Sequence, residues 1–278
     1  MHWIVAIVTR LGWRKRLSSL VTSISLISGC TLIALPPNTP TPVPTATPPS
    51  TANGWEALTP GLERRTYSPG GDYPFTQLTA LRIDPAYYSF RVHYRPGDPL
   101  TLSQWREQLP SAAAFVNANF FDAQGQILGM LVADGAVYGQ SFTDRGGMFQ
   151  VQNGAPRIRS LIAEPYMAET LEQAAQAFPM LVLNGQPAFT NEQGDRVSRR
   201  TVIGQDSQGR VVLIVTPSLI GMRLVDISAY LPTTDLDLVN AFNLDGGGST
   251  MMFVNTQPAT QVISFDPVPA VLAVYPRG

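Results

Sequence analysis

The sequence predicts an α+β fold, with a mixed, largely antiparallel sheet, several hairpins and a few interspersed helices. From Thr79 onward, short apolar runs alternate with tight turns, and three of these turns carry an Asp-Gly or Asn-Gly dipeptide. Helical patterns are few and follow no regular strand-helix alternation. A parallel, doubly wound sheet would require that alternation, so antiparallel or mixed strands are expected instead.

The turn dipeptides predict where the hairpins lie. Asp134-Gly135, Asn153-Gly154 and Asn184-Gly185 each separate two apolar runs. Asp, Asn and Gly tolerate the positive φ angles of two-residue hairpin turns, so each dipeptide predicts one hairpin. A fourth hairpin is expected around residues 206–209.

Three segments have helical patterns. Thr101 and Gln104 form a capping-box pattern that predicts a helix over 102–109. Residues 168–178 are rich in strong helix formers and end before a proline, so a second helix is expected there. A third is expected over 224–231, where apolar residues recur at helical spacing.

The N-terminal segment has the features of an export signal. A basic cluster at 14–16 precedes a short apolar stretch over 17–26, which is too short for the roughly 20 apolar residues of a spanning helix. Small residues before Cys30 resemble a bacterial lipobox. We therefore expect residues 1–29 to be a lipoprotein-type signal peptide, and the protein to be exported and anchored to the cell membrane by lipid on Cys30, facing outside the cytoplasm. A plain signal anchor with an incidental cysteine is the alternative.

Residues 30–54 form a tether rich in proline and threonine. Such a tract favours extended polyproline II and cannot form a core. At about 3.1 Å per residue, 18 residues of it reach on the order of 55 Å. The folded domain is expected over 55–278, held clear of the lipid surface.

Composition limits the available chemistry. From residue 30 onward the chain has 15 basic and 20 acidic residues, a net charge of −5, without the dense basic face that nucleic-acid binding needs. Beyond the N-terminus His93 is the only histidine, and Cys30 is the only cysteine in the chain. A zinc site of histidines and cysteines cannot form. Carboxylates, arginines, hydroxyls, amides and backbone N–H groups remain, and we predict no cofactor and no metal ion.

The strongest candidate site follows a predicted buried strand at 239–244. It is the loop Asp245-Gly246-Gly247-Gly248-Ser249-Thr250. Three glycines cost conformational entropy, which suggests that the backbone turns sharply or approaches a ligand. Successive N–H groups with two hydroxyls could hold an anion, although the glycine–lysine ending of a P-loop is missing. A glycine-rich bulge joining two strands is the alternative.

Two further segments carry candidate residues. Asn117 and Asn119 alternate on one face of a predicted strand, just before Asp122, and their amides suit sugar hydroxyls or, alternatively, backbone groups at a strand end. Arg200 enters a predicted core strand and offers a planar fork for phosphate, and an ordinary arginine at a strand edge is the alternative. Arg199 points to the opposite face and fits an ordinary arginine at a strand edge.

The order of these segments closely resembles the phosphodiester glycosidase family. The resemblance rests on residues 116–122, 181–185, 200–204, 221–224 and 243–249, and it runs from about Leu81 to Ala273. It implies that Asp245, Arg200 and Asn119 line an active site, with the loop Gly246 to Ser249 holding phosphate or sugar. The first block departs from the usual Asn-Gly-Gly-Phe-Phe, so Asn117 is the safer counterpart of the family residue.

These residues suggest the hydrolysis of a sugar-1-phosphodiester in an envelope or extracellular glycan, which releases free sugar. Arg200 and the loop N–H groups would bind phosphate, and Asp245 would act on the anomeric carbon, as nucleophile or as base for water. Asn117 and Asn119 would orient the sugar, and Asp122 is a candidate second carboxylate. The alternatives are a non-catalytic surface lipoprotein that binds anionic polysaccharide, and a protein-binding module in envelope assembly.

Overall fold

The computed structural model describes residues 54–217 and 219–278. These residues fall in one compact unit of the chain. The predicted signal peptide, Cys30 and the tether up to residue 53 lie outside the described residues. No helix in the described part combines the length and hydropathy needed to cross a bilayer.

Three sheets make up the domain, and every strand pairing in them is antiparallel. The first sheet has eight strands in the order β1 (Glu56–Thr59), β2 (Leu62–Tyr67), β3 (Leu78–Ile83), β14 (Val211–Val215), β13 (Thr201–Asp206), β15 (Leu238–Asn243), β11 (Met180–Leu183) and β12 (Gln186–Pro187). The second has five in the order β7 (Ala136–Gly139), β6 (Met130–Ala133), β10 (Gln173–Ala177), β8 (Gly147–Gln152) and β9 (Ala155–Ser160). The third has five in the order β17 (Thr260–Val262), β16 (Met252–Val254), β5 (Ala114–Asn117), β18 (Ala270–Pro276) and β4 (Tyr88–Tyr94).

The four predicted hairpins are confirmed. They join β6 to β7, β8 to β9, β11 to β12 and β13 to β14. At the first three turns both dipeptide residues have positive φ, for example 49° at Asp134 and 81° at Gly135. This backbone conformation matches the twist of the flanking strands, which explains why these residue pairs mark the turns.

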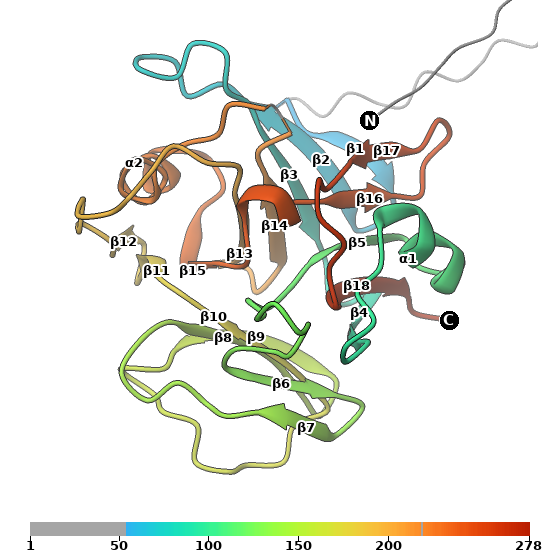
Figure 1. Ribbon diagram of the computed structural model, residues 1–278. Coiled ribbons are helices and arrows are strands. Elements are labelled where there is room, and N and C mark those ends of the chain that lie inside the picture. The colour runs from blue at the N-terminus through green and yellow to red at the C-terminus, as the bar shows by residue number, and fades with distance from the viewer. Residues whose placement is uncertain (1–53, 218) are drawn as a thin grey trace, which may run out of the picture. The chain divides into compact units, whose positions relative to one another are not determined.

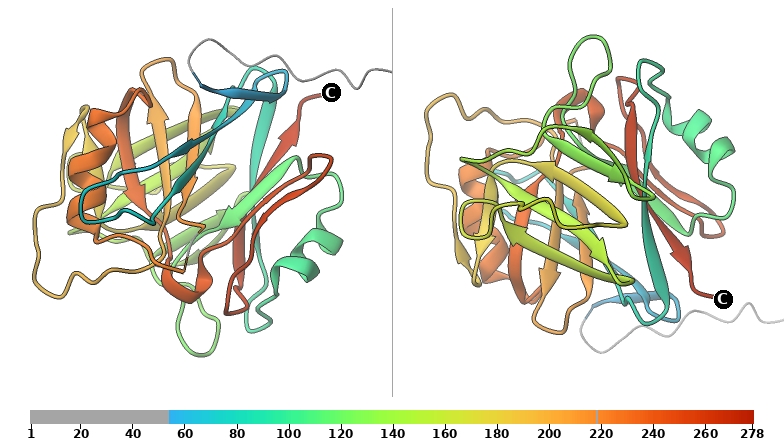
Figure 2. Two further views of the ribbon diagram at one scale, coloured as in Figure 1. Left: turned by 90° about the horizontal axis from the view of Figure 1, so that it is seen from above. Right: turned by 90° about the horizontal axis from the view of Figure 1, so that it is seen from below.

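Each sheet turns one face toward a shared central core. Strand β14 illustrates this arrangement, because Val211, Leu213 and Val215 join the core cluster that contains residues of all three sheets. Val212 and Ile214 point the other way, into a second cluster beneath α2. The alternation follows from the period of two in a strand, and its all-apolar sequence follows from burial on both faces. Figures 1 and 2 show the three sheets around this core.

The two predicted helices at 102–109 and 224–231 are confirmed, and each covers the outer face of a sheet. Helix α1 (Leu102–Gln108) begins with the expected capping box and buries Trp105, whose indole N–H donates to the Val268 carbonyl at 3.0 Å. Helix α2 (Leu224–Tyr230) buries Ile227 against the first sheet and continues into the 3-10 turn η1 (Leu231–Thr233). Both helices lie on the outside of the sheets in Figure 2.

The expected helix over 168–178 is wrong. Strand β10 occupies its second half, paired between β6 and β8, and all five of its residues are buried. Small alanines fit between closely packed neighbours on both faces, so tertiary packing overrides the helix propensity. With this strand and only two short α-helices, the domain is richer in β-structure than α+β implies, while the expected antiparallel pairing is confirmed.

Candidate active site

Strand β15 positions the candidate carboxylate at the point where two sheets meet. Its last residue Asn243 pairs with β13, and the next amides continue the pattern, with Leu244 N–H donating to the Thr201 carbonyl at 2.8 Å. The N–H of Asp245 then donates to the Ala118 carbonyl, just beyond β5 of the third sheet, at 3.0 Å. Asp245 is therefore held by the backbone of both sheets. Its place is fixed before any ligand binds.

Asp245 opens into a pocket of about 430 Å³. The lining combines apolar and aromatic groups with convergent polar side chains. Its residues are Phe120, Phe178, Pro179, Phe189, Gln193, Gly194, Asp195, Arg196, Ser198, Arg200, Leu224, Asn243, Asp245 and Gly246. Aromatic walls with a few placed polar groups are typical of a small-molecule site.

Burial raises the pKa of Asp245 from 3.8 to about 6. The nearby Asp266 carboxylate raises this pKa further, while the Ser249 hydroxyl and the Gly246 N–H, which donates to Oδ1 at 2.8 Å, lower it. A carboxylate held in an apolar setting is a stronger base than one in water. Perturbed pKa values of this kind concentrate at functional sites.

Asn243 presents a second polar group to the same pocket. Its side chain is 3% exposed, and its amide nitrogen donates to the Phe178 carbonyl at 3.1 Å. The amide oxygen Oδ1 is buried and has no hydrogen-bond partner. An orphaned acceptor of this kind costs free energy.

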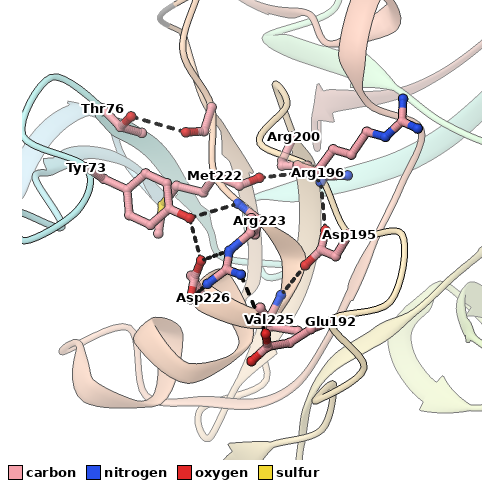
Figure 3. A network of polar contacts seen from close by, with 11 residues as sticks. Tyr73, Thr76, Glu192, Asp195, Arg196, Arg200, Met222, Arg223, Val225 and Asp226 are labelled. Atoms are coloured by element: carbon pink, nitrogen blue, oxygen red, sulfur yellow. Dashed lines mark hydrogen bonds and ion pairs between the residues drawn. The ribbon is translucent and has the colours of Figure 1, made fainter.

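A polar network fixes Arg200, which lines the same pocket (Figure 3). Its Nε donates to the Met222 carbonyl at 3.0 Å, and Nη2 donates to Asp195 at 3.1 Å. The other carboxylate oxygen of Asp195 accepts the N–H of Val225 in the first turn of α2 at 2.9 Å. Burial lowers the pKa of Arg200, and the charge of Asp195 raises it. These bonds hold the guanidinium of Arg200 in one orientation at the pocket.

Arg199 is not the ordinary strand-edge arginine that the sequence suggested. It is 4% exposed, its Nη2 donates to the Ile263 carbonyl at 2.9 Å, and its guanidinium lies 4.5 Å from the centre of the Phe265 ring. Its Nε and Nη1 are buried without partners. The segment around Phe265 packs over this side chain. The sequence pattern of one strand could not predict this cover, because the segment is remote in sequence.

Asn117 ties the site together from behind the pocket lining. It is 1% exposed, and its Nδ2 donates to the Asp245 carbonyl at 2.6 Å. Its Oδ1 accepts the Thr201 hydroxyl at 2.8 Å and the Met251 N–H at 3.0 Å. These bonds join β5, β13 and the glycine loop to one another, and Asn117 is not among the pocket-lining residues, so its sugar-orienting role stays a prediction.

Asn119 likewise lies outside the pocket lining. Its Nδ2 donates to the carbonyls of Met130 and Gln176, both at 3.0 Å, and so links the third sheet to the second. Its Oδ1 is buried without a partner. Asn119 lies beyond the end of β5, and its side chain contacts the second sheet rather than the pocket.

The glycines of the loop are required by contacts inside the protein. A Cβ on Gly246 would lie 2.8 Å from the Arg199 carbonyl, and one on Gly248 would lie 1.9 Å from the Asp266 carboxylate. Gly247 has a φ of 61° and begins the 3-10 turn η2 (Gly247–Ser249). The close approach that the triple glycine predicted is real, but it is an approach to neighbouring chain segments.

The phosphate cradle of loop N–H groups stays a prediction, and four of the loop's N–H groups already donate to acceptors within the protein. The Gly246 N–H donates to the Asp245 side chain and the Gly247 N–H to the Arg199 carbonyl at 2.8 Å. The N–H groups of Ser249 and Thr250 donate to carbonyls within the loop. Of the loop residues after Asp245, only Gly246 lines the pocket. The loop therefore shapes and positions Asp245, and the cationic side chains of the pocket lining are those of Arg196 and Arg200.

Asp122 is also away from the pocket. Its Oδ1 accepts the N–H groups of Gln124 and Gln126, both at 2.9 Å, and closes its own turn. This is the usual local bonding of an aspartate in a tight turn, so a second catalytic carboxylate at this position is not supported. Within residues 54–217 and 219–278, no group of three or more His, Cys, Asp or Glu side chains is placed to hold a metal ion.

Several pocket residues were missed by the sequence reasoning. Asn243 could have been found, because it precedes Asp245 by two positions and must share its side of the strand. Asp195 and Arg196 lie in a segment without regular structure, just before the arginine that was identified. The aromatic walls come from three separate segments, which only the fold brings together: they are Phe120, Phe178 and Phe189.

Comparison with known proteins agrees with this architecture. The mouse N-acetylglucosamine-1-phosphodiester alpha-N-acetylglucosaminidase is 24% identical over 162 residues, which cover 50% of this chain and 31% of the mouse protein. The chain thus matches about a third of the length of that relative.

Three solved structures share the fold. The zebrafish N-acetylglucosamine-1-phosphodiester alpha-N-acetylglucosaminidase catalytic domain, auto-inhibited by its pro-peptide, has a TM-score of 0.61 at 19% identity, covering 80% of this chain and 86% of that one. A hypothetical protein from Synechocystis has a TM-score of 0.57 at 15% identity, covering 80% and 63%. A putative exported protein from Burkholderia pseudomallei has a TM-score of 0.53 at 13% identity, covering 72% and 74%.

The phosphodiester glycosidase family model matches residues 111–275, which contain Asp245, Asn243 and Arg200. This match covers more than half of the chain and includes β5 to β18 with the whole pocket lining. The chain belongs to the phosphodiester glycosidase family.

Proposed function

We propose that the domain hydrolyses a sugar-1-phosphodiester at the bond between the anomeric carbon and the phosphate oxygen. Family membership supports glycosidase-type hydrolysis of a phosphodiester-linked sugar. The observation that carries the proposal is Asp245, a buried carboxylate with a pKa of about 6, in a pocket that Arg200 also lines. The pocket thus offers both a base or nucleophile and a cation, as the reaction requires.

In the reaction, Asp245 attacks the anomeric carbon or removes a proton from the attacking water. The C1–O bond breaks, its electron pair leaves with the phosphate, and water supplies the new hydroxyl on the sugar. A phosphate monoester is a stable leaving anion, so strong help from a general acid is less necessary than for an alkoxide. No histidine is therefore needed in the pocket.

Arg200 and Arg196 are proposed to stabilise the charge that accumulates on the departing phosphate. Both line the pocket, and Arg200 is held in place by Asp195 and Met222. A preorganised cation stabilises developing charge without reorganising during the reaction. The sequence analysis gave this role to Arg200 together with the N–H groups of the glycine loop, and here Arg196 takes the place of the loop.

The sugar is proposed to lie between the aromatic walls and the end of β15. Phe120, Phe178 and Phe189 offer apolar faces to the ring, and the unpartnered Oδ1 of Asn243 accepts a hydrogen bond from a hydroxyl or an acetamido N–H. Such a combination fixes ligand orientation through few, well placed polar contacts. The printed name of the mouse relative makes an N-acetylglucosamine-1-phosphodiester the first substrate to test.

We further propose that the enzyme acts outside the cytoplasm, on a phosphate-linked envelope glycan, while anchored by lipid on Cys30. The signal-like segment 1–29 and the proline-rich stretch 30–54 support export and tethering. Labelling cells with a radioactive fatty acid and comparing the wild type with Cys30→Ser tests the anchor. Label that persists in Cys30→Ser would contradict it.

Incubating the purified full chain with a methyl N-acetylglucosamine-1-phosphodiester and measuring free sugar tests the activity. We expect the wild type to release sugar and Asp245→Asn to be slower by roughly 100- to 10,000-fold. Asp98→Asn is the matched control, since Asp98 is an exposed carboxylate paired with Arg95 and outside the pocket.

Equal rates for the wild type and Asp245→Asn would contradict the assignment of Asp245. Tight, saturable binding of the diester without any sugar release would instead support the non-catalytic alternative, a lipoprotein that binds anionic polysaccharide.

A further inference from the structure

A larger hollow, of about 570 Å³, lies outside the active-site pocket. We call it the Tyr87 hollow. Its lining is Ala57, Leu58, Thr59, Pro60, Gly61, Glu63, Arg82, Asp84, Tyr87 and Arg210. It shares no residue with the pocket around Asp245, and all of its lining except Arg210 precedes residue 111, where the family match begins. The Tyr87 hollow is therefore separate from the active site and is built mainly by residues outside the matched region.

Tyr87 gives this hollow an exposed aromatic ring whose position is fixed. The residue is 52% exposed. A Cβ on Gly61 would lie 2.6 Å from Cδ2 of Tyr87, so the ring lies directly against the Gly61 backbone. The Tyr87 N–H donates to the Asp84 carbonyl at 3.0 Å, and the Tyr87 carbonyl accepts the Arg277 N–H at 2.7 Å. The ring is thus an apolar surface that is formed before any ligand binds.

Two arginines line the hollow in orientations that carboxylates fix. Arg82 donates from Nε to Glu63 at 2.8 Å, and its guanidinium lies 4.0 Å from the ring centre of the buried Trp55. Arg210 donates from Nε to the buried Asp206 at 2.6 Å. No hydrogen bond joins Nη1 of Arg82 or either terminal nitrogen of Arg210 to the residues that the structure describes. These nitrogens are oriented donors for a ligand.

The charges of the hollow do not favour an anion. Both arginines are paired with carboxylates, so the hollow offers no surplus positive charge to a phosphate or a sugar acid. Asp84 is the remaining charged residue of the lining, and one of its oxygens accepts the Ala86 N–H at 2.8 Å. Oriented N–H donors and carboxylate acceptors thus occur together. Since a hydroxyl both donates and accepts, this mixture fits an uncharged ligand with several hydroxyls.

We propose that the Tyr87 hollow is a second carbohydrate site, which binds an uncharged pyranose unit of a glycan. The apolar face of the sugar ring packs on Tyr87, and the sugar hydroxyls bond to the arginines and to Asp84. A hollow of this size with an aromatic wall and a few polar groups is typical of small-molecule sites, which measure roughly 300–1,000 Å³. The inference goes beyond the proposed function, because this site holds a glycan and takes no part in its hydrolysis.

Titration calorimetry of the full chain tests the proposal with five probes. Three are uncharged hexaoses, namely cellohexaose, maltohexaose and N-acetylchitohexaose, while hexagalacturonate is an anion and the glucosamine hexaose a cation. We expect saturable binding of at least one uncharged hexaose. Tyr87→Ala should weaken this binding about tenfold or more, since the aromatic surface is lost. The charged probes should show no binding that Tyr87→Ala removes.

Tyr138→Ala is the matched control, because Tyr138 is an exposed tyrosine on β7 that does not line the hollow, and it should bind as the wild type does. Denaturation of Tyr87→Ala, and its release of sugar from the methyl diester, should match the wild type. Asp84→Asn is a second test, since an amide can still accept the Ala86 N–H but replaces one acceptor oxygen with a donor. It should weaken binding about fivefold or more.

Three results would overturn the inference: no binding of any uncharged hexaose, an affinity that Tyr87→Ala and Asp84→Asn leave unchanged, or tighter binding of a charged hexaose that depends on Tyr87. Each of them would leave the proposed hydrolysis at Asp245 intact, because the two sites share no residue. Loss of sugar release from the methyl diester in Asp245→Asn, with hexaose binding retained, would support two independent sites.

Discussion

Two polar pairs with the same spacing end two buried strands, and their roles differ. Asn117 and Asn119 end β5, and Asn243 and Asp245 end β15. The first pair bonds to backbone and side-chain groups of three sheets. The second pair faces the pocket, with one orphaned amide oxygen and one carboxylate of raised pKa.

The two pairs therefore contribute differently to the stability of the fold. The β5 pair stabilises the junction of the sheets, because its donors are satisfied by the protein. Each pair contains one buried amide oxygen without a partner, on Asn119 and on Asn243, and the β15 pair differs because it lines the pocket and carries a carboxylate of raised pKa. Asn117 also links the two, since it donates to the carbonyl of Asp245 itself.

Removing the Asn117 amide should have the largest effect on stability. We expect Asn117→Ala to lower the free energy of unfolding by about 2–4 kcal/mol, because the Thr201 hydroxyl, the Met251 N–H and the Asp245 carbonyl all lose their partner. Chemical denaturation measures it. A loss below about 0.5 kcal/mol would show that the junction does not depend on this side chain.

Neutralising Asp245 should raise the free energy of unfolding, whereas removing the Asn117 amide should lower it. Its pKa is about 6 in the folded protein and 3.8 ordinarily, so the stability linked to its proton is present below about pH 4 and is lost as pH rises through 6. Asp245→Asn should therefore be more stable than the wild type by about 1–3 kcal/mol at pH 7.5, and by less at pH 4.5. Denaturation at both values tests this, and an equal difference at the two would contradict the raised pKa.

The pH dependence of kcat/KM tests the raised pKa of Asp245 in a second way. If the ionised form of Asp245 reacts, kcat/KM should fall about tenfold per pH unit below about pH 6. Asp266→Asn removes a neighbouring negative charge and should move the inflection to lower pH. An inflection that stays in place would mean that Asp266 does not act on Asp245.

The smallest effect is expected from Asn243. Asn243→Ala should raise KM about 5- to 20-fold through loss of one hydrogen bond to the sugar. Asn119→Ala is the matched comparison, since it also removes a buried, unpartnered amide oxygen but lies outside the pocket lining. It should change KM less than twofold. Equal changes in both would indicate that Asn243 acts only through the fold.

The local parts of the fold were predictable from the sequence. Asp134-Gly135 and the other turn dipeptides adopt the positive φ that identified them, and Thr101 caps α1 as expected. These features depend on residues next to one another in the chain. Strand β10 was mistaken for a helix because its alanines are selected by neighbours on β6 and β8, which are remote in sequence.

For the site, Asp245 was singled out by its position after a predicted buried strand and Arg200 by the family resemblance, and the pocket lining contains both. The sequence could not decide whether the Asn117 side chain meets a ligand or the protein. The strand period gives the side of the sheet but not what lies on that side. Asp195 was missed because its bond to Arg200 depends on a loop that brings Asp195 to the start of α2.

The position of bond cleavage tests the central claim most directly. Hydrolysis of a sugar-1-phosphodiester in water enriched with oxygen-18, followed by mass spectrometry of both products, reports which atom the water attacks. Attack at the anomeric carbon next to Asp245 places the heavy oxygen on C1 of the released sugar and leaves the phosphate monoester unlabelled. Label in the phosphate would identify a phosphodiesterase and contradict the account.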